Sequence, residues 1–247
     1  MKANPIPALT LLLAACAGTP ARPTTEHAEP AARAVAEAVV ERMGGWEAWD
    51  STRYLRWRFF GRREHWWDKA TGDVRIDTGD VLLLMNLGTR QGRAWRDGVE
   101  VQDPDALAEL LEQGYGWWVN DSYWMFMPYK LLDPGVHLRD LGAGSLADGR
   151  DARVLELTFD TVGLTPDNRY EVFVAADSGL VEQWSFYASA TDEAPAFTGP
   201  WTDWRPFGDL WLAASRGRGA DWYIAAPAEL PRELFTSPDD VPEELQG

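Results

Sequence analysis

The sequence has one cysteine, Cys16, and three histidines in 247 residues. A lone cysteine cannot form a disulfide within the chain, so stability must come from the burial of apolar side chains. Fourteen tryptophans, nine phenylalanines and seven tyrosines provide a large apolar area for that burial. The sequence also has no CxxC, no HExxH and no pair of histidines at ligand spacing, which disfavours a zinc site. We therefore expect no metal ion and no cofactor.

Positive charge is scarce and does not cluster. The chain has 23 lysines and arginines but 39 aspartates and glutamates, which gives a formal net charge of -16. Only Lys2, Lys69 and Lys130 are lysines, and no run of basic residues forms a stripe. Because binding to a phosphate backbone depends on basic side chains that neutralise it, we expect no nucleic-acid partner.

Recognisable catalytic motifs are also lacking. The sequence contains no GxSxG elbow, no SxxK and no Walker A loop. Gly142-Ala143-Gly144 is a lone GxG without the rest of a phosphate-binding fingerprint, and a turn is its simpler explanation. These absences favour a protein that is not an enzyme.

The N-terminus has the pattern of an export signal. Lys2 precedes an apolar segment from Ile6 to Ala15, which is about half the length needed to cross a bilayer. Such a segment indicates a signal peptide rather than a transmembrane helix. It ends in Leu13-Ala14-Ala15-Cys16, which resembles the lipobox of bacterial lipoproteins. The resemblance covers the first eighteen residues. It implies that residues 1–15 are removed and that Cys16 carries a diacylglyceryl group.

A lipidated Cys16 would make a membrane the first partner of the protein. Two or more acyl chains give stable anchoring, whereas one chain gives only marginal binding. Residue 17 is alanine. In the sorting systems that this motif resembles, an aspartate there favours the inner membrane. We therefore expect a cell-envelope protein at the outer membrane, on its periplasmic or surface face. The alternative is an ordinary signal peptide with an incidental cysteine.

The next segments predict a tether and then helices. Residues 16–30 are rich in proline, threonine and small residues, as in a flexible tether. From Ala31 to Met43 the apolar residues follow the i, i+3, i+4, i+7 spacing of an amphipathic helix. In the middle of the chain, Asp103 can cap a helix with Pro104 in its first position, and that helix should end at Gly114. Residues 120–132 predict a second short helical or irregular piece.

In most of the remaining chain, apolar and polar residues alternate as they do in β-strands. Leu55, Trp57 and Phe59 alternate with polar neighbours, so one face is apolar and the other is wet. Turn signals recur about every 8–12 residues, and Asp97-Gly98 is a strong hairpin signal. Residues 31–235 therefore predict a mainly β domain. We expect a single curved, incompletely closed, barrel-like antiparallel sheet with an N-terminal helix and a mid-chain helical insert. The acidic residues 236–247 should form a loose tail.

This order of elements resembles the lipoprotein-carrier fold of the LolA and LolB proteins. Three stretches add to the resemblance: Arg53 to Phe60 (RYLRWRFF), Pro128 to Val136 (PYKLLDPGV) and Asn168 to Ser185 (NRYEVFVAADSGLVEQWS). It spans most of the mature chain, but it is one of topology and carries no catalytic or binding motif. The resemblance implies a curved sheet whose helical cover encloses an apolar cavity for acyl chains.

An apolar cavity would be lined by the inner face of the sheet. The candidates are Leu55, Trp57, Phe59, Leu83, Met85, Leu157, Phe159, Trp184 and Phe186. A lipid-like ligand bound there would make the protein a binding or transfer protein. The alternative for the same residues is a filled core, because alternating apolar positions most often face other side chains.

Two further functions stay open at this point. Trp66-Trp67, Trp117-Trp118, Trp201 and Trp204 could stack on sugar rings, which would make the protein a carbohydrate-binding surface lipoprotein. Exposed, coplanar rings would favour that function, whereas inward rings would favour a lipid or a core. A purely structural envelope lipoprotein is the third possibility.

Overall fold

The computed structural model describes residues 22, 24–161, 163–217 and 222–245. The predicted signal peptide and Cys16 lie outside the described residues. The described chain has three α-helices, namely α1 (Pro30–Arg42), α2 (Gly45–Ser51) and α3 (Pro104–Phe126). It also has three short 3-10 helices, namely η1 (Met127–Lys130), η2 (Arg232–Phe235) and η3 (Glu243–Leu245).

Fourteen strands make up most of the fold. They are β1 (Tyr54–Phe59), β2 (Arg63–Asp68), β3 (Asp73–Asp77), β4 (Val81–Asn86), β5 (Gly92–Arg96), β6 (Val99–Glu100), β7 (Val136–Ser145), β8 (Asp151–Phe159), β9 (Arg169–Ala175), β10 (Val181–Tyr187), β11 (Phe197–Pro200), β12 (Thr202–Phe207), β13 (Leu210–Ser215) and β14 (Tyr223–Ala225). All strand pairs in the three sheets are antiparallel.

The predicted fold class is confirmed, with one difference in the sheet. Within the described ranges, the strands form a seven-stranded sheet (β14-β1-β2-β3-β4-β5-β6), a five-stranded sheet (β11-β10-β9-β8-β7) and the pair β12-β13, none of them closed into a barrel. The sequence predicts one continuous sheet instead. The division falls where α3 and η1 stand between β6 and β7, so these two consecutive strands do not pair.

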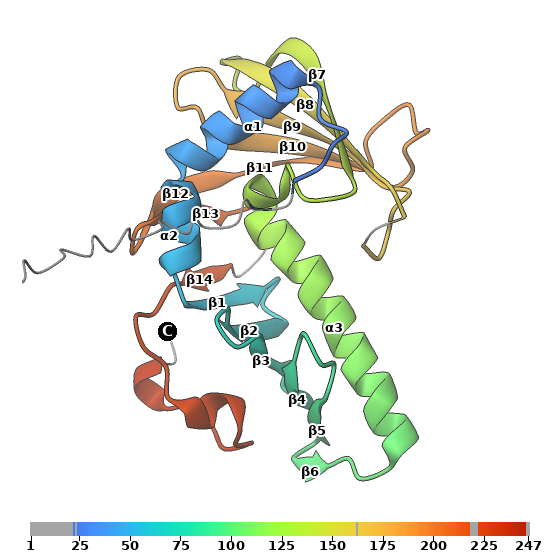
Figure 1. Cartoon of the computed structure of the whole chain (residues 1–247), viewed down its shortest axis with the longest axis vertical. Helices are drawn as coiled ribbons and strands as arrows, with labels where there is room; N and C mark the ends of the chain where they lie inside the picture. The colour runs from blue at the N-terminus through green and yellow to red at the C-terminus, as the bar shows by residue number, and fades with distance from the viewer. Residues whose placement is uncertain (1–21, 23, 162, 218–221, 246–247) are drawn as a thin grey trace, which may run out of the picture.

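The N-terminal helix forms nearly where the sequence predicts it. α1 buries Ala32, Ala36, Val39 and Val40 and packs against the five-stranded sheet at β7 (Figure 1). It ends before Gly44, whose φ of 107° lies in the left-handed region. A Cβ atom at Gly44 would lie 2.4 Å from the backbone oxygen of Asp209, so only glycine fits there.

The mid-chain insert is one helix rather than two pieces. As predicted, Asp103 caps α3 by accepting a hydrogen bond from the Ala106 amide at 2.9 Å, and Pro104 occupies the first turn. Gly114 does not end the helix. A Cβ atom there would lie 2.2 Å from Cδ1 of Leu83, so this glycine allows α3 to approach the seven-stranded sheet closely. The helix continues to Phe126, just before Pro128 in η1.

Part of the predicted tether belongs to the folded domain. The amide of Thr25 donates to the Leu132 carbonyl at 2.8 Å, and the amide of Glu29 donates to the Leu138 carbonyl at 2.9 Å. Leu138 donates in return to the His27 carbonyl at 3.1 Å. Thr25 is buried, and its hydroxyl donates to the Val136 carbonyl at 2.5 Å. The chain is therefore attached to β7 from about residue 25, earlier than the predicted start at residue 31.

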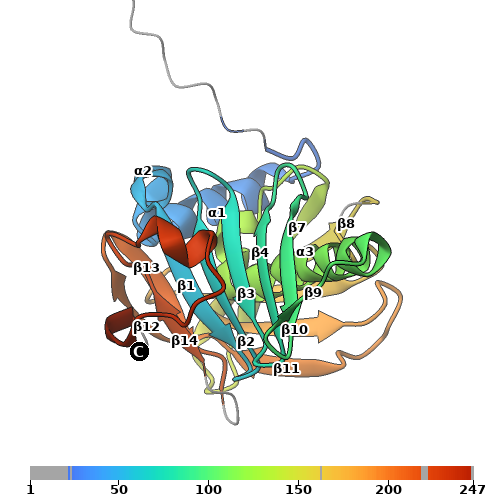
Figure 2. The ribbon, with the colours of Figure 1, turned by 90° about the horizontal axis from the view of Figure 1, so that it is seen from below.

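The C-terminal segment is not loose up to residue 245. Arg75 donates to the carbonyls of Ser237 and Asp239, each at 3.1 Å, and Arg56 donates to the carbonyl of Leu245. This segment (red in Figures 1 and 2) covers the face of the seven-stranded sheet that is turned away from α3. It explains why Arg56, on the face that the sequence predicts to be wet, is only 3% exposed.

Candidate functional site

The predicted lining residues lie mainly in filled cores. Leu55, Trp57, Phe59, Leu157 and Trp184 are buried in the main core, and Leu83 and Met85 are buried in a second core beneath α3. Phe159 and Phe186 lie half-buried at the edge of the main core. Only Phe159 of these nine residues lines the cavity described next, and Phe59 borders a smaller pocket beside Phe60, Arg62 and Arg63.

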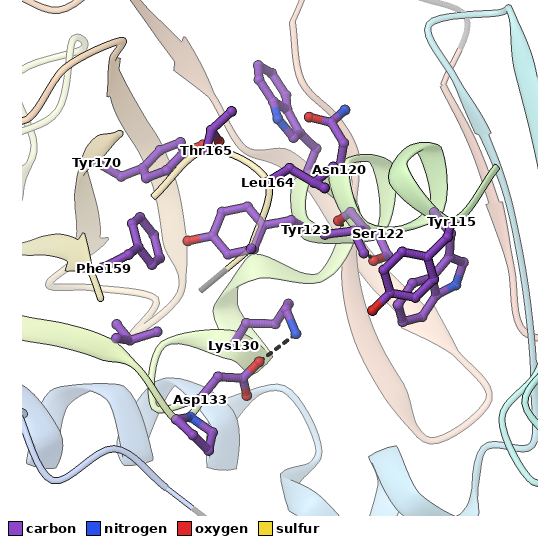
Figure 3. Close-up of a pocket in the computed structure, with 16 residues that line it drawn as sticks. Tyr115, Asn120, Ser122, Tyr123, Lys130, Asp133, Phe159, Leu164, Thr165 and Tyr170 are labelled. Carbon is purple, nitrogen blue, oxygen red and sulfur yellow. Dashed lines mark hydrogen bonds and ion pairs between the residues drawn. The ribbon is translucent and has the colours of Figure 1, made fainter. Parts of the chain in front are cut away.

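A cavity of about 300 Å³ lies beside the C-terminal half of α3 (Figure 3). The helix contributes one face, because positions 115, 118, 119, 122 and 123 follow the i, i+3, i+4 spacing. The opposite wall comes from β7, β8, β9 and the loop at 163–165. The lining residues are Tyr115, Trp118, Val119, Asn120, Ser122, Tyr123, Trp124, Lys130, Asp133, Pro134, Val136, Phe159, Gly163, Leu164, Thr165 and Tyr170.

The charges at the cavity neutralise each other. Lys130 Nζ lies 2.5 Å from Asp133 Oδ2, and both side chains are a little over one-third exposed. The two residues are three positions apart and lie in the stretch from Pro128 to Val136, one of the three that resemble the LolA and LolB proteins. This ion pair therefore gives the cavity wall polar groups but no net charge.

Two polar groups beside the cavity are buried without a partner among the described residues. They are the hydroxyl of Tyr123 and Nε1 of Trp118. Burial raises the pKa of Tyr123, so its hydroxyl stays protonated and can donate a hydrogen bond. The Tyr123 ring lies 5.5 Å from Tyr170 and 6.1 Å from Phe159 between ring centroids. A buried donor without an acceptor costs about 1–3 kcal/mol, which a ligand oxygen could recover.

A buried polar network holds α3 on the seven-stranded sheet near this cavity. Asp121 is fully buried and accepts hydrogen bonds from Arg63 Nε at 2.7 Å, Arg63 Nη2 at 2.8 Å and Asn120 at 2.9 Å. His65, also fully buried, lies with Nε2 2.7 Å from Asp121 Oδ2. Because the carboxylate can only accept, Nε2 of His65 carries the hydrogen. Trp57 stacks on the imidazole at 4.6 Å.

Burial sets the charge states of this network. Burial lowers the pKa of His65 and outweighs its hydrogen bond to Asp121. Nδ1 of His65 has no partner within the described chain, so a proton there would be an unsatisfied buried donor. Burial alone would raise the pKa of Asp121, but hydrogen bonds from His65 and Arg63 lower it below its usual value. The network therefore consists of a neutral imidazole, a carboxylate and a guanidinium.

Because His65 is neutral in the folded protein, we expect the free energy of unfolding to fall as the pH is lowered from 7 to 5. The unfolded chain binds a proton at this histidine near pH 6.5, whereas the folded chain, with its lowered pKa, does not. The stabilisation is complete above pH 6.5 and is lost at up to about 1.4 kcal/mol per pH unit below it. We expect the free energy of unfolding in urea to fall by about 1–2 kcal/mol. Asp121 stays ionised over this range because its pKa is lowered.

A substitution that removes no titratable group provides the control. Trp211→Ala, at an exposed position, should leave the slope of stability against pH unchanged, whereas His65→Gln should flatten it. A His65 imidazole that titrates at its ordinary pH in NMR spectra of the folded protein would contradict this prediction.

The structure also brings together three possible metal ligands that are far apart in the sequence. His27, His137 and Asp160 each offer one ligand atom, and these atoms all lie within 4.8 Å of one another. The two imidazoles stack in parallel, with ring centroids 4.3 Å apart. Their separation in sequence hides the cluster, because the first histidine lies in the predicted tether and the second in β7. His27 and His137 come together because their neighbours Ala28 and Leu138 pair, and nothing in the local sequence indicates that pairing.

The tryptophans considered for sugar binding do not form an exposed platform. Trp66 and Trp201 are each 1% exposed. Trp67, Trp117, Trp118 and Trp204 are half-buried, and each packs against a hydrophobic core. Trp66 packs against the C-terminal segment, whereas Trp67 contacts Trp118 on the opposite face of the sheet.

Comparison with solved structures finds a likeness of fold at low sequence identity. No protein-family model matches the sequence, and a search of curated proteins finds no match either. The crystal structure of a DUF1329 family protein from Desulfovibrio piger aligns with a TM-score of 0.43 and 14% sequence identity. The alignment covers 83% of this chain and 96% of that chain. None of the described helices combines the length and the apolar character that crossing a bilayer requires.

Proposed function

We propose that the protein is a non-enzymatic, membrane-anchored envelope lipoprotein whose α3 cavity binds one small amphipathic, lipid-like molecule. The observation that carries the proposal is the cavity itself. It combines apolar walls from Val119, Phe159 and Leu164 with two buried polar groups that lack partners. Ligand sites typically join an apolar lining with a few polar groups that fix orientation.

The volume limits the ligand. At roughly 30 Å³ for each group the size of a water molecule, 300 Å³ holds about ten non-hydrogen atoms. That is one short acyl chain with its head group, and it is too small for the several chains of a whole phospholipid or lipoprotein. The proposed ligand is therefore a single-chain amphiphile. An oxygen on its head group would accept from Tyr123 once the side chain turns its buried hydroxyl toward the cavity.

Fatty acids of increasing length test this proposal on the purified protein. Calorimetry should show that affinity rises about threefold to fourfold per methylene, as expected for about 0.8 kcal/mol of burial. The gain should stop near eight to ten carbons, where further methylenes would remain in water. Steady strengthening to sixteen carbons, or no binding at any length, would contradict the proposal.

Two variants localise the binding. Val119→Trp places a large ring in the cavity and should abolish binding, whereas Glu112→Trp, at an exposed position of the same helix, should leave it unchanged. Tyr123→Phe keeps the ring but removes the hydroxyl, and the loss of one hydrogen bond should weaken binding about threefold to tenfold. Native mass spectrometry of protein purified from its own envelope would then show which molecule is bound.

Carbohydrate binding is the weaker alternative. The rings considered for it are buried or half-buried, and Trp211, at 42% exposed, is the one tryptophan that the structure records as an exposed large hydrophobic residue. Retention of the protein on a polysaccharide column, lost in Trp211→Ala, would favour this alternative.

A further inference from the structure

We infer that His27, His137 and Asp160 form a binding site for one divalent transition-metal ion of the zinc type, which fastens the N-terminal segment to the five-stranded sheet. The three residues come from separate parts of the chain. His27 lies in the segment before α1, His137 near the start of β7, and Asp160 directly after β8. Nothing in the proposed ligand-binding function requires this site.

The distances are close to those that a metal ion needs. His137 Nε2 lies 2.7 Å from Asp160 Oδ1, and His27 Nε2 lies 3.8 Å from Asp160 Oδ2. Ligands at about 2.0–2.1 Å from one zinc ion lie roughly 3–3.5 Å from each other. The side chains are between about 40% and 50% exposed, so they can rotate and an ion can enter from solvent. The parallel imidazoles would turn toward each other on binding, because each nitrogen lone pair lies in the plane of its ring.

The donor set selects the type of ion. Two imidazole nitrogens and one carboxylate oxygen suit zinc and its first-row neighbours, whereas calcium and magnesium prefer oxygen ligands. Three protein ligands leave a fourth position for water. The two imidazoles face different oxygens of the same carboxylate, Oδ1 for His137 and Oδ2 for His27, so all three side chains are directed to one small region. The net charge of -16 favours the approach of cations generally.

The backbone holds two of the ligands in a fixed frame. The His27 carbonyl accepts from the Leu138 amide at 3.1 Å, and Ala28 forms a parallel bridge with Leu138. The Asp160 amide donates to the Gly135 carbonyl at 2.9 Å. Binding would therefore cost little ordering of the chain. Because the metal would link the segment before α1 to β7 and β8, it should suppress the local opening of that segment.

Zinc titration of the full-length protein, after removal of metal by a chelator, tests the inference. We expect saturable binding of one zinc ion per chain by competition with a chromophoric chelator. The single variants His27→Gln, His137→Gln and Asp160→Asn should each weaken binding by at least roughly tenfold. Asp167→Asn, an exposed carboxylate in the loop after β8, should bind as the unmodified protein does.

Hydrogen exchange provides the second readout. Zinc should slow exchange of the amides of residues 25–29 in the unmodified protein and should not do so in His137→Gln. The inference is overturned if zinc binding is not saturable, or if all three ligand variants bind as tightly as the unmodified protein. The second result would show adventitious binding to the many surface carboxylates.

Discussion

Replacing Asp121 with alanine should lower the free energy of unfolding by about 3–5 kcal/mol, the usual loss when one partner of a buried ion pair is removed. The variant leaves two buried or half-buried groups without their acceptor. The His65 Nε2 hydrogen loses its only acceptor in a fully buried position, and Arg63, with 21% of its side chain exposed, loses a bidentate carboxylate. Urea unfolding at pH 7.5 measures the effect.

Two further variants separate this effect from general damage to α3. Glu112→Ala, on the same helix as Asp121, breaks an exposed ion pair with Arg90 from the β4–β5 turn and should cost at most about 1 kcal/mol. Asp121→Asn keeps one acceptor oxygen and should fall between the two. If Asp121→Ala and Glu112→Ala cost the same, the network does not stabilise the contact between α3 and the sheet.

The sequence predicts the elements of this fold better than the contacts between them. Alternation of apolar residues identifies most strands, Asp97-Gly98 forms the hairpin turn with φ values of 50° and 76°, and the cap at Asp103 is confirmed. These features depend on neighbours in sequence. The length of α3 does not, because Gly114 is set by the close approach of Leu83 from another part of the chain.

The candidate sites show the same limit. Alternation correctly assigns Leu55, Trp57 and Phe59 to an apolar face, but it cannot tell whether that face meets a ligand or other side chains. The cavity instead lies beside α3, where the sequence predicts only a short helical or irregular piece over residues 120–132. The histidine cluster joins residues 110 positions apart and depends on the pairing of the N-terminal segment with β7. No local pattern contains that information.

Truncating Trp184 to alanine should also cost about 3–5 kcal/mol, because a large buried ring leaves a cavity that the core cannot close. Trp184 is 1% exposed and lies at the centre of an aromatic cluster. It stacks on Tyr170 at 5.3 Å and meets Trp124 and Trp201 edge-on at 4.7 Å and 5.6 Å. Urea unfolding measures this loss, and an unchanged slope against urea would show that the unfolded state is unaffected.

The same substitution at an exposed ring gives the comparison. Trp211→Ala, at 42% exposure, should cost about 1 kcal/mol or less, and Trp184→Phe should lie between the two alanine variants. Because Tyr170 and Trp124 also line the α3 cavity, Trp184→Ala should loosen two of its walls and weaken fatty-acid binding. Equal losses for Trp184→Ala and Trp211→Ala would mean that the aromatic cluster is not a tightly packed core. The packing that limits the cavity to one short chain would then need another explanation.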